Sequence, residues 1–328
     1  MGTILFFDTS IGTFNHGDDI IMRSVYRAFN QLLKNNYRLN YATHLVNYTS
    51  RYADEAKIQS CMSTKMKFIC GTDILWPNPF DQIKRKQLQI SSIVNKPSIY
   101  CGSILLGAGI KNTDRMIPDH KSISLYNRVL SHEYIHSVRD DSARALLNSM
   151  GFMAINTGCP TLWMLDEEFC KGIPCEKSDA CVLALTSEKK NRILDSKLIQ
   201  IVKENYSKVY FWVQRWTDDE YLLSLTNCAD IEFIYDLDDY ETLLKTTEVD
   251  YIGTRLHGGI FALQNKRRAI IIAVDHRAQG MAKENNLIVV NRDDVDVIQD
   301  MIYSSFGTKV ALNKEGIQAF MSQFAEGE

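Results

Sequence analysis

The sequence contains no long apolar run. A membrane-spanning helix needs roughly 20 consecutive apolar residues, and Ala269–Val274 is among the longest runs in this chain. The first eight residues also lack the positive start of a secretory signal and reach an acid after a short apolar stretch. We therefore expect a soluble, cytoplasmic protein that meets a membrane only peripherally, at the inner face of the cell membrane.

The chain also lacks a large charge of either sign. Its formal net charge is −3, whereas a general grip on nucleic acid or on anionic lipid requires a basic face. We expect no nucleic-acid partner. An anionic substrate has to be held by a few local groups.

The eight cysteines form no Cys-x-x-Cys pair, although four of them crowd between Cys159 and Cys181. In a cytoplasmic chain of this length, thiols that pack in the interior are the expected form, ahead of disulfides or a zinc site. We expect no metal.

The second half of the sequence alternates short β-rich runs with longer amphipathic segments, a pattern typical of βα units in a parallel sheet. Six strands are expected there, at Ala180–Thr186, Val209–Gln214, Ile231–Tyr235, Val249–Gly253, Ala269–Val274 and Leu287–Val290. Expected helices include Lys190–Glu204, Asp218–Leu225 and Tyr240–Thr246.

The first half starts similarly, with a strand at Ile4–Phe7, a glycine-containing loop to Asp19 and a helix over 20–33. Further strands are expected at Ala42–Val46, Lys67–Cys70, Pro97–Cys101, Tyr134–Val138 and Met153–Asn156. A chain of 328 residues exceeds the usual size of one core. We expect lobes over 1–170 and 171–310, with the boundary within Glu167–Asp179, and a helical tail over 311–328.

These patterns predict an α/β protein with two Rossmann-like lobes that face a cleft. Ligands in such folds bind beyond the carboxyl ends of the strands. The strongest candidate lies where the strand ending at Gly253 leads into a helix through Phe261. Arg255 and His257, beside the positive end of a helix dipole, suit a carboxylate or phosphate, and Gly258 lets a ligand approach the backbone. The alternative is a capped helix with a surface Arg and His.

Two other segments are candidates. Arg139 follows an expected strand, so it faces the cleft from the other lobe or, equally, forms a surface ion pair. The loop Asn15-His16-Gly17-Asp18-Asp19 offers polar side chains for a sugar, although Asn and Asp are also common helix caps.

The string His132-Glu133-Tyr134-Ile135-His136 matches a zinc-peptidase signature that works only on a helix. The tract from Tyr134 is predicted to be a strand. Histidines four apart on a strand lie about 13 Å from each other, too far to share a metal. We therefore reject a zinc peptidase.

Several motifs in their order along the chain resemble the polysaccharide pyruvyl transferase family. They are Asn15-x-Gly17-Asp18, Val138-Arg139-Asp140-x-x-Ser142, Gly158-Cys159-Pro160-Thr161, Phe211-Trp212-Val213-Gln214 with Asp218, Gly253-Thr254-Arg255-Leu256-His257 and Asp275-His276-Arg277. The cysteine-rich stretch up to Cys181 and the basic run Lys266-Arg267-Arg268 depart from the family's pattern.

The resemblance implies a glycosyltransferase-B-like fold and transfer of a pyruvyl group from phosphoenolpyruvate onto two hydroxyls of a sugar, which gives a cyclic ketal. It implies phosphoenolpyruvate as co-substrate and no further cofactor. It also implies that the acceptor is a sugar or a lipid-linked oligosaccharide. The family's donor-binding arginines fall on Arg139 and Arg255, and its Leu-His pair on Leu256 and His257. We expect Leu256 and Gly258 also to bind the donor, Asn15, Gly17 and Gln214 to bind the acceptor, and His257 and Asp18 to be catalytic.

A mechanism follows as a hypothesis. Protonated His257 delivers a proton to the donor's methylene carbon, and Asp18 accepts one from the attacking hydroxyl. Two alternatives stay open: a glycosyltransferase that uses a nucleotide sugar, with Arg255 on the diphosphate, and a non-catalytic relative that binds glycans or anions.

Overall fold

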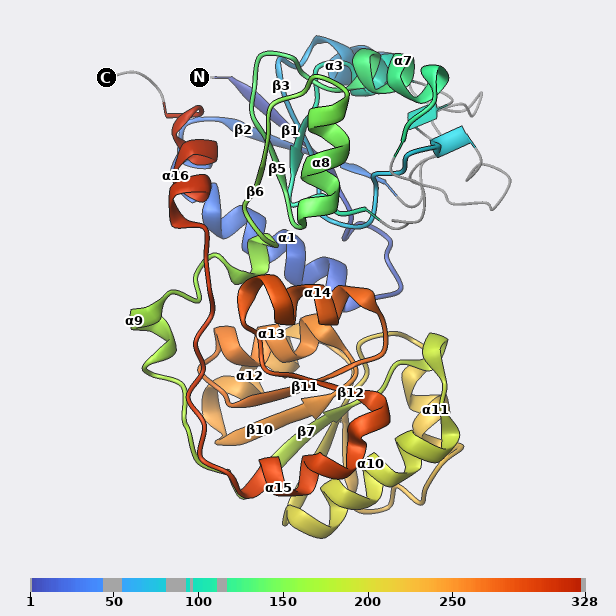
Figure 1. The fold of residues 1–328 in the computed structure, drawn as a ribbon, viewed down its shortest axis with the longest axis vertical. Coiled ribbons are helices and arrows are strands. Elements are labelled where there is room, and N and C mark those ends of the chain that lie inside the picture. The colour runs from blue at the N-terminus through green and yellow to red at the C-terminus, as the bar shows by residue number, and fades with distance from the viewer. Residues whose placement is uncertain (1, 44–54, 81–92, 95–96, 111–116, 326–328) are drawn as a thin grey trace. The chain divides into compact units, whose positions relative to one another are not determined.

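The computed structural model describes residues 2–43, 55–80, 93–94, 97–110 and 117–325, and it confirms the predicted α/β class with parallel sheets (Figure 1). Contacts divide the chain into two units. The first is Met1–Thr13, Ile21–Trp163 and Asn313–Glu328, and the second is Phe14–Ile20 and Met164–Leu312. The sequence predicted lobe boundaries at residues 170 and 310. In the structure the chain passes from one unit to the other after Trp163 and after Leu312, and the short segment Phe14–Ile20 also belongs to the second unit.

The second unit contains one six-stranded sheet in which every pair of neighbours is parallel. Its strands are β7 (Ala180–Ala184), β8 (Lys208–Trp212), β9 (Ile231–Ile234), β10 (Val249–Gly253), β11 (Ala269–Ala273) and β12 (Val289–Asn291). All six predicted strands are confirmed, with ends that differ by a residue or two. Strands β7, β10 and β11 are buried along their whole length, as parallel strands covered on both faces should be.

Helices cover both faces of this sheet. The helices of this unit are α9 (Glu167–Cys170), α10 (Arg192–Asn205), α11 (Asp218–Leu223), α12 (Leu237–Thr246), α13 (Leu256–Gln264), α14 (His276–Asn285) and α15 (Ile298–Tyr303), with 3-10 turns at Ser187–Lys189 and Arg292–Val297. Figure 1 shows α10 and α15 on one face and α12 and α13 on the other. The helices predicted from periodicity, α10, α11 and α12, are confirmed.

The strand order decides where a ligand can bind in this unit. The sheet runs β12-β11-β10-β7-β8-β9, so the chain moves outward from β7 in one direction and from β10 in the other. The order reverses between these two neighbours. In open α/β sheets, the crevice beyond the carboxyl ends at such a reversal is the usual ligand site.

The first unit has a second parallel sheet in the order β2-β1-β3-β4. Its strands are β1 (Thr3–Asp8), β2 (Tyr37–Ala42), β3 (Met66–Cys70) and β4 (Ile104–Leu106), and a parallel pair, β5 (His136–Val138) and β6 (Ala154–Asn156), extends it. The bridge between Ala108 and Val138 joins β5 to the edge beside β4.

The helices of the first unit include one from the far end of the chain. They are α1 (His16–Ala28), which begins in the second unit, α2 (Asn30–Lys34), α3 (Glu55–Ser63), α6 (Pro97–Tyr100), α7 (His120–Val129), α8 (Asp141–Ser149) and α16 (Lys314–Ser322), with a 3-10 turn at Pro160–Leu162. Phe320 and Phe324, in and just after α16, pack against the ring of Phe29, and Phe324 also packs against Phe68. This aromatic cluster attaches α16 to the first unit.

Some predictions for the first half were wrong. Pro97–Cys101 is not a strand but the short helix α6, because a proline is tolerated in the first turn of a helix, where its missing N–H is not needed. The short strand β4 was not predicted. Strand β2 lies earlier than the predicted Ala42–Val46, whose residues from 44 onward lie outside the described ones. Helix α1 starts at His16, within the predicted loop. The acidic side chains of Asp18 and Asp19 in its first turn interact favourably with the positive end of the helix dipole.

The eight cysteines are all free thiols. Cys61, Cys70, Cys159, Cys170 and Cys181 are buried, as predicted, whereas Cys101 and Cys175 are exposed. Among the helices in the described ranges, none is long and apolar enough to cross a bilayer.

The contact between β7 and β10 depends on a glycine. A Cβ on Gly253 would lie 2.5 Å from the carbonyl oxygen of Ala184, a backbone atom that cannot move aside. We expect Gly253→Ala to lower the free energy of unfolding by about 3 kcal/mol. Gly280→Ala in α14 is the control, since its Cβ meets open space, and it should gain about 0.5–1 kcal/mol. Urea unfolding measures both, and equal midpoints would contradict the expectation.

Candidate functional site

The ends of β7 and β10 are joined by hydrogen bonds where the strand order reverses. The backbone N–H of Thr254 donates to the carbonyl of Ala184 over 2.8 Å. The hydroxyl of Thr186 donates to the carbonyl of Thr254 over 3.0 Å, and the two threonine hydroxyls lie 2.9 Å apart. The floor of the crevice is therefore rigid.

Helix α13 starts directly above this floor, with Arg255 at its N-cap and His257 in its first turn. Both side chains are buried. The two glycines that follow serve packing: a Cβ on Gly258 would lie 3.1 Å from Gln214 Oε1, and one on Gly259 would lie 2.5 Å from Ile271 Cγ1. The predicted space for a ligand beside these glycines is thus filled by protein atoms.

Carboxylates hold the Arg255 guanidinium. Its Nε donates to Asp218 Oδ2 over 2.8 Å and its Nη2 donates to Asp218 Oδ1. Nη2 also donates to Glu188 Oε2 over 2.7 Å, whereas Nη1 is 3.5 Å from Glu188 Oε1. Burial alone would lower the pKa of Arg255, but hydrogen bonds and charge from Asp218 and Glu188 outweigh burial, and the net shift is upward.

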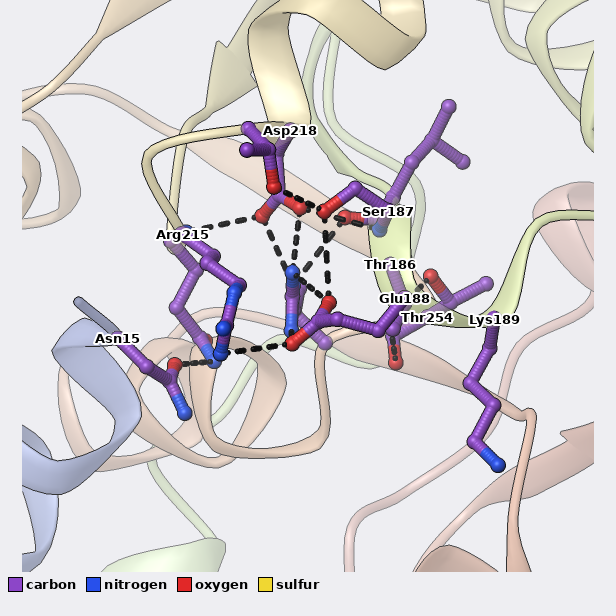
Figure 2. Close-up of polar contacts among 12 residues, drawn as sticks. Asn15, Thr186, Ser187, Glu188, Lys189, Arg215, Asp218 and Thr254 are labelled. Atoms are coloured by element: carbon purple, nitrogen blue, oxygen red, sulfur yellow. Dashed lines mark hydrogen bonds and ion pairs between the residues drawn. The ribbon is translucent and has the colours of Figure 1, made fainter. Parts of the chain in front are cut away.

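Glu188 joins a second arginine to this cluster. Its Oε1 lies 3.0 Å from Arg215 Nη1, and Figure 2 shows the Glu188 carboxylate directed towards Arg215 while the Lys189 side chain points away from the cluster. Burial would raise the pKa of Glu188, but the charge and hydrogen bonds of Arg255 outweigh it, and the net shift is downward. Sequence reasoning missed Glu188 and Arg215. Their positions within a few residues of β7 and β8 were the available signal.

A small cavity of about 40 Å³ lies at this crevice. Its lining comes from the carboxyl ends of four neighbouring strands, from the first turns of α13 and α14 and from the segment before α1, namely Asn15, Thr186, Gln214, Thr254, Arg255, Leu256, His257, Val274, Asp275, Arg277 and Ala278. Two helix N-termini therefore face one cavity, and both dipoles favour negative charge there.

Asp275 balances part of that positive field. It caps α14 and accepts a hydrogen bond of 2.6 Å from Arg277 Nη2. Burial would raise the pKa of Asp275, but the hydrogen bonds and charge of Arg277 outweigh it and lower the pKa.

The segment before α1 forms one wall of the cavity. Asn15 pairs with Arg215 in an antiparallel bridge, and Gln214 Nε2 donates to Asn15 Oδ1 over 3.0 Å. The other amide atom, Gln214 Oε1, is buried and accepts no hydrogen bond within the described parts of the chain. The structure thus brings the predicted residues Asn15, Gln214, Arg255, Leu256 and His257 together at one cavity.

Gly17 and Asp18 lie nearby in the first turn of α1, outside the cavity lining. Gly17 is packed closely against Gln214 and Asn15. His16 places its Nδ1 2.9 Å from Asp19 Oδ2 and its Nε2 3.0 Å from the carbonyl of Tyr235. Both partners accept hydrogen bonds, which favours the doubly protonated ring. The hydrogen bond with Asp19 accordingly raises the pKa of His16, even though burial opposes it.

Arg139 belongs to the first unit, directly after β5. It is buried and forms an ion pair with Asp73 in the loop after β3. Gly109 leaves the space for its side chain, since a Cβ there would lie 2.3 Å from Arg139 Nε. Asp140 caps α8 by accepting from the N–H of Ala143 over 2.7 Å.

The histidines of the zinc-like string have structural roles. His136 is buried, with Nδ1 accepting from the N–H of Leu105 over 3.0 Å and Nε2 donating to the carbonyl of Ser131 over 2.9 Å. This arrangement needs a neutral ring, and burial lowers its pKa to about 4. His132 stacks on Phe152. Across the described ranges, no three His, Cys, Asp or Glu side chains are grouped to hold a metal.

A parallel sheet in Rossmann order, with a polar cavity at the strand-order reversal and two helix N-termini directed at it, defines a Rossmann-type α/β protein with the geometry of a ligand site. A family model described as polysaccharide pyruvyl transferase matches residues 15–276, well over half of the chain. The chain therefore belongs to the polysaccharide pyruvyl transferase family, as its motifs predicted, and is a transferase with a role in pyruvyl transfer in polysaccharide biosynthesis.

Other comparisons give weaker likenesses. The UDP-GlcNAc 2-epimerase from Neisseria meningitidis, bound to UDP-GlcNAc, has 12% sequence identity, with 98% of each chain covered and a TM-score of 0.45. The E. coli heptosyltransferase WaaC, with ADP-2-deoxy-2-fluoro heptose, has 10% identity, with 82% of this chain and 88% of the other covered and a TM-score of 0.33. Both TM-scores are below 0.5, so the fold assignment rests on the sheets described above. No curated protein gives a significant match.

The contact between Glu188 and the arginines predicts a dependence of stability on pH. Because the folded state lowers the pKa of Glu188 below its ordinary 4.5, the ionised side chain stabilises the fold above that pH. The stabilisation is lost as the pH falls through the lowered pKa. Glu188→Gln should therefore be less stable than the wild type at about pH 7, with the difference shrinking as the pH falls below 4.5. Urea midpoints across this range measure the difference.

Glu204→Gln, an exposed change in α10, is the control. A difference between Glu188→Gln and the wild type that stays constant over the whole pH range would contradict the role given to the Glu188 carboxylate.

Proposed function

We propose that the chain transfers the pyruvyl group of phosphoenolpyruvate onto two hydroxyls of one sugar in a surface polysaccharide or its precursor, and so forms a cyclic ketal. The observation that carries the proposal is the cavity at the strand-order reversal, where two helix N-termini, Arg255 and His257 meet. Family membership supports the same reaction class.

The donor side of the cavity suits a small anion. Phosphoenolpyruvate carries a carboxylate and a phosphate, and the N–H groups at the starts of α13 and α14 are oriented to accept negative charge. In the proposal Leu256 and Gly258 contribute backbone N–H groups from the first turn of α13. Arg255 presents its Nη1 edge, which is less engaged by carboxylates than its Nη2 edge. We also propose Arg139 as a donor-binding residue.

The acceptor side of the cavity offers hydrogen-bonding groups. Gln214 Oε1 is a buried acceptor that receives no hydrogen bond from the described residues, and a sugar hydroxyl would satisfy it. Asn15, held by Gln214 and bridged to Arg215, lies beside it. We assign Asn15, Gly17 and Gln214 to the acceptor side, where a lipid-linked oligosaccharide or a free glycan presents its hydroxyl pair.

The chemistry proceeds by proton transfer and two additions. Protonated His257 gives its proton to the methylene carbon of the donor, while the first sugar hydroxyl bonds to the adjacent carbon and releases its proton to Asp18. The bond from that carbon to the phosphate oxygen then breaks. The second hydroxyl bonds to the same carbon and closes the ketal. Of the two protons lost from hydroxyls, one restores His257 and the other leaves with phosphate.

Ligand-dependent stability distinguishes the donor classes. A donor that binds only the folded state, at a concentration of 100 times its Kd, should raise the free energy of unfolding by about 2.7 kcal/mol. We expect phosphoenolpyruvate to give such a thermal shift, and UDP- and ADP-sugars to give none. A shift with a nucleotide sugar and none with phosphoenolpyruvate would favour a glycosyltransferase, the alternative that the Rossmann order of the second unit also serves.

Replacing the proposed acid tests the mechanism. His257→Ala should reduce phosphate release from phosphoenolpyruvate, in the presence of acceptor glycans, by about 10²- to 10⁴-fold, the contribution of a general acid. His120→Ala, an exposed change at the start of α7, is the control and should keep full activity. Circular dichroism checks that both variants fold. Full activity in folded His257→Ala would exclude the mechanism.

A further inference from the structure

Two large aromatic side chains lie exposed beside the cavity in the second unit. Phe14 is 67% exposed and Trp216 is 63% exposed. Their ring centroids are 6.0 Å apart, with an interplanar angle of 48°. Neither ring contributes to the core of the unit, and adjacent exposed aromatic residues commonly mark a binding surface.

Backbone contacts hold this Phe14–Trp216 pair in place. Asn15 and Arg215 form an antiparallel bridge, and the N–H of His16 donates to the carbonyl of Gln214 over 2.9 Å. This pairing sets Phe14 opposite Trp216, one step away from the bridge. The rings are therefore presented by an ordered backbone, which reduces the entropy that a ligand would lose in ordering them.

The polar groups around the pair indicate which ligand it suits. Asn15, which follows Phe14, lines the cavity, and Arg215, which precedes Trp216, is paired with Glu188. The side chains of Arg215 and Glu188 are 33% and 39% exposed. Charges of both signs beside the rings disfavour insertion into acyl chains and give no preference for an anionic lipid. A saccharide, with apolar C–H faces and a rim of hydroxyls, matches both parts of the surface.

We propose that the Phe14–Trp216 pair binds a pyranose ring of the acceptor glycan outside the cavity, while the sugar that receives the pyruvyl group reaches Asn15 and Gln214. The assignment rests on the proposed function and deepens it, because it adds to the acceptor site a second place, outside the cavity, that binds a neighbouring pyranose ring. The aromatic faces contribute affinity, and the polar rim contributes orientation.

The test uses the full chain and oligosaccharides released by mild acid from the surface polysaccharide of the source cells. Binding is measured by saturation-transfer NMR and by isothermal titration. We expect the double variant Phe14→Ala/Trp216→Ala to bind these oligosaccharides at least roughly tenfold more weakly than the wild type, because truncating two paired aromatic anchors removes their contact with the ligand. The variant Phe14→Tyr/Trp216→Tyr keeps the ring faces and should restore most of the affinity.

Tyr303→Ala is the matched control, because Tyr303 is also 63% exposed but lies at the end of α15. It should bind as the wild type does. The thermal shift with phosphoenolpyruvate should be unchanged in the double variant. The two proposals can therefore fail separately. If the donor proposal is wrong, the wild type gives no thermal shift with phosphoenolpyruvate. If the aromatic-pair proposal is wrong, the wild type and the double variant bind the glycan equally well.

Three results would overturn the inference. The first is equal glycan affinity in the wild type and the double variant, and the second is no oligosaccharide binding by the wild type. The third is co-sedimentation of the wild type, but not of the double variant, with vesicles of equimolar phosphatidylcholine and phosphatidylglycerol while glycan affinity stays unchanged. That third result would assign the pair to a membrane surface.

Discussion

The buried carboxylate of Asp218 is the group on which the site in the second unit depends. It accepts hydrogen bonds from the backbone N–H of Ser187 after β7, from that of Arg215 after β8 and from the guanidinium of Arg255 after β10. A single side chain therefore fixes three strand ends. Removing a carboxylate from water costs several kcal/mol unless partners satisfy it, and here each of its oxygens has such partners, so the loops at this edge are set as one rigid group.

The parallel sheet of the second unit was predictable because its strands are short continuous runs of β-branched and aliphatic residues, such as Ala269–Ala273, between longer amphipathic helices. The first unit was harder to predict. Ile104–Leu106 is too short to show a period, and Pro97–Tyr100 carries apolar residues that suit a strand or a helix equally. The pairing that makes β4 a strand comes from β3, distant in sequence, and no local pattern reports it.

The site was predictable in position more than in detail. Charged residues after a strand end, such as Arg255, indicated the carboxyl edge of the sheet, and the structure places Arg255 and His257 at the same cavity. The contacts of Arg255 were not predictable, because Asp218 at the start of α11 and Glu188 in the 3-10 turn after β7 are more than thirty residues away in sequence. Gly258 was predicted to leave space for a ligand to approach the backbone. That role could not be distinguished from close packing on Trp212 without coordinates.

The attachment of α16 to the first unit has a consequence for synthesis on the ribosome. The second unit's segment Met164–Leu312 interrupts the first unit, and the aromatic cluster of Phe29 and Phe68 lacks Phe320 and Phe324 until those residues have been translated. The segment Met164–Leu312 therefore leaves the ribosome before helix α16, which completes the first unit. Nascent chains held in that interval expose unfilled aromatic surface, the kind of surface that chaperones bind.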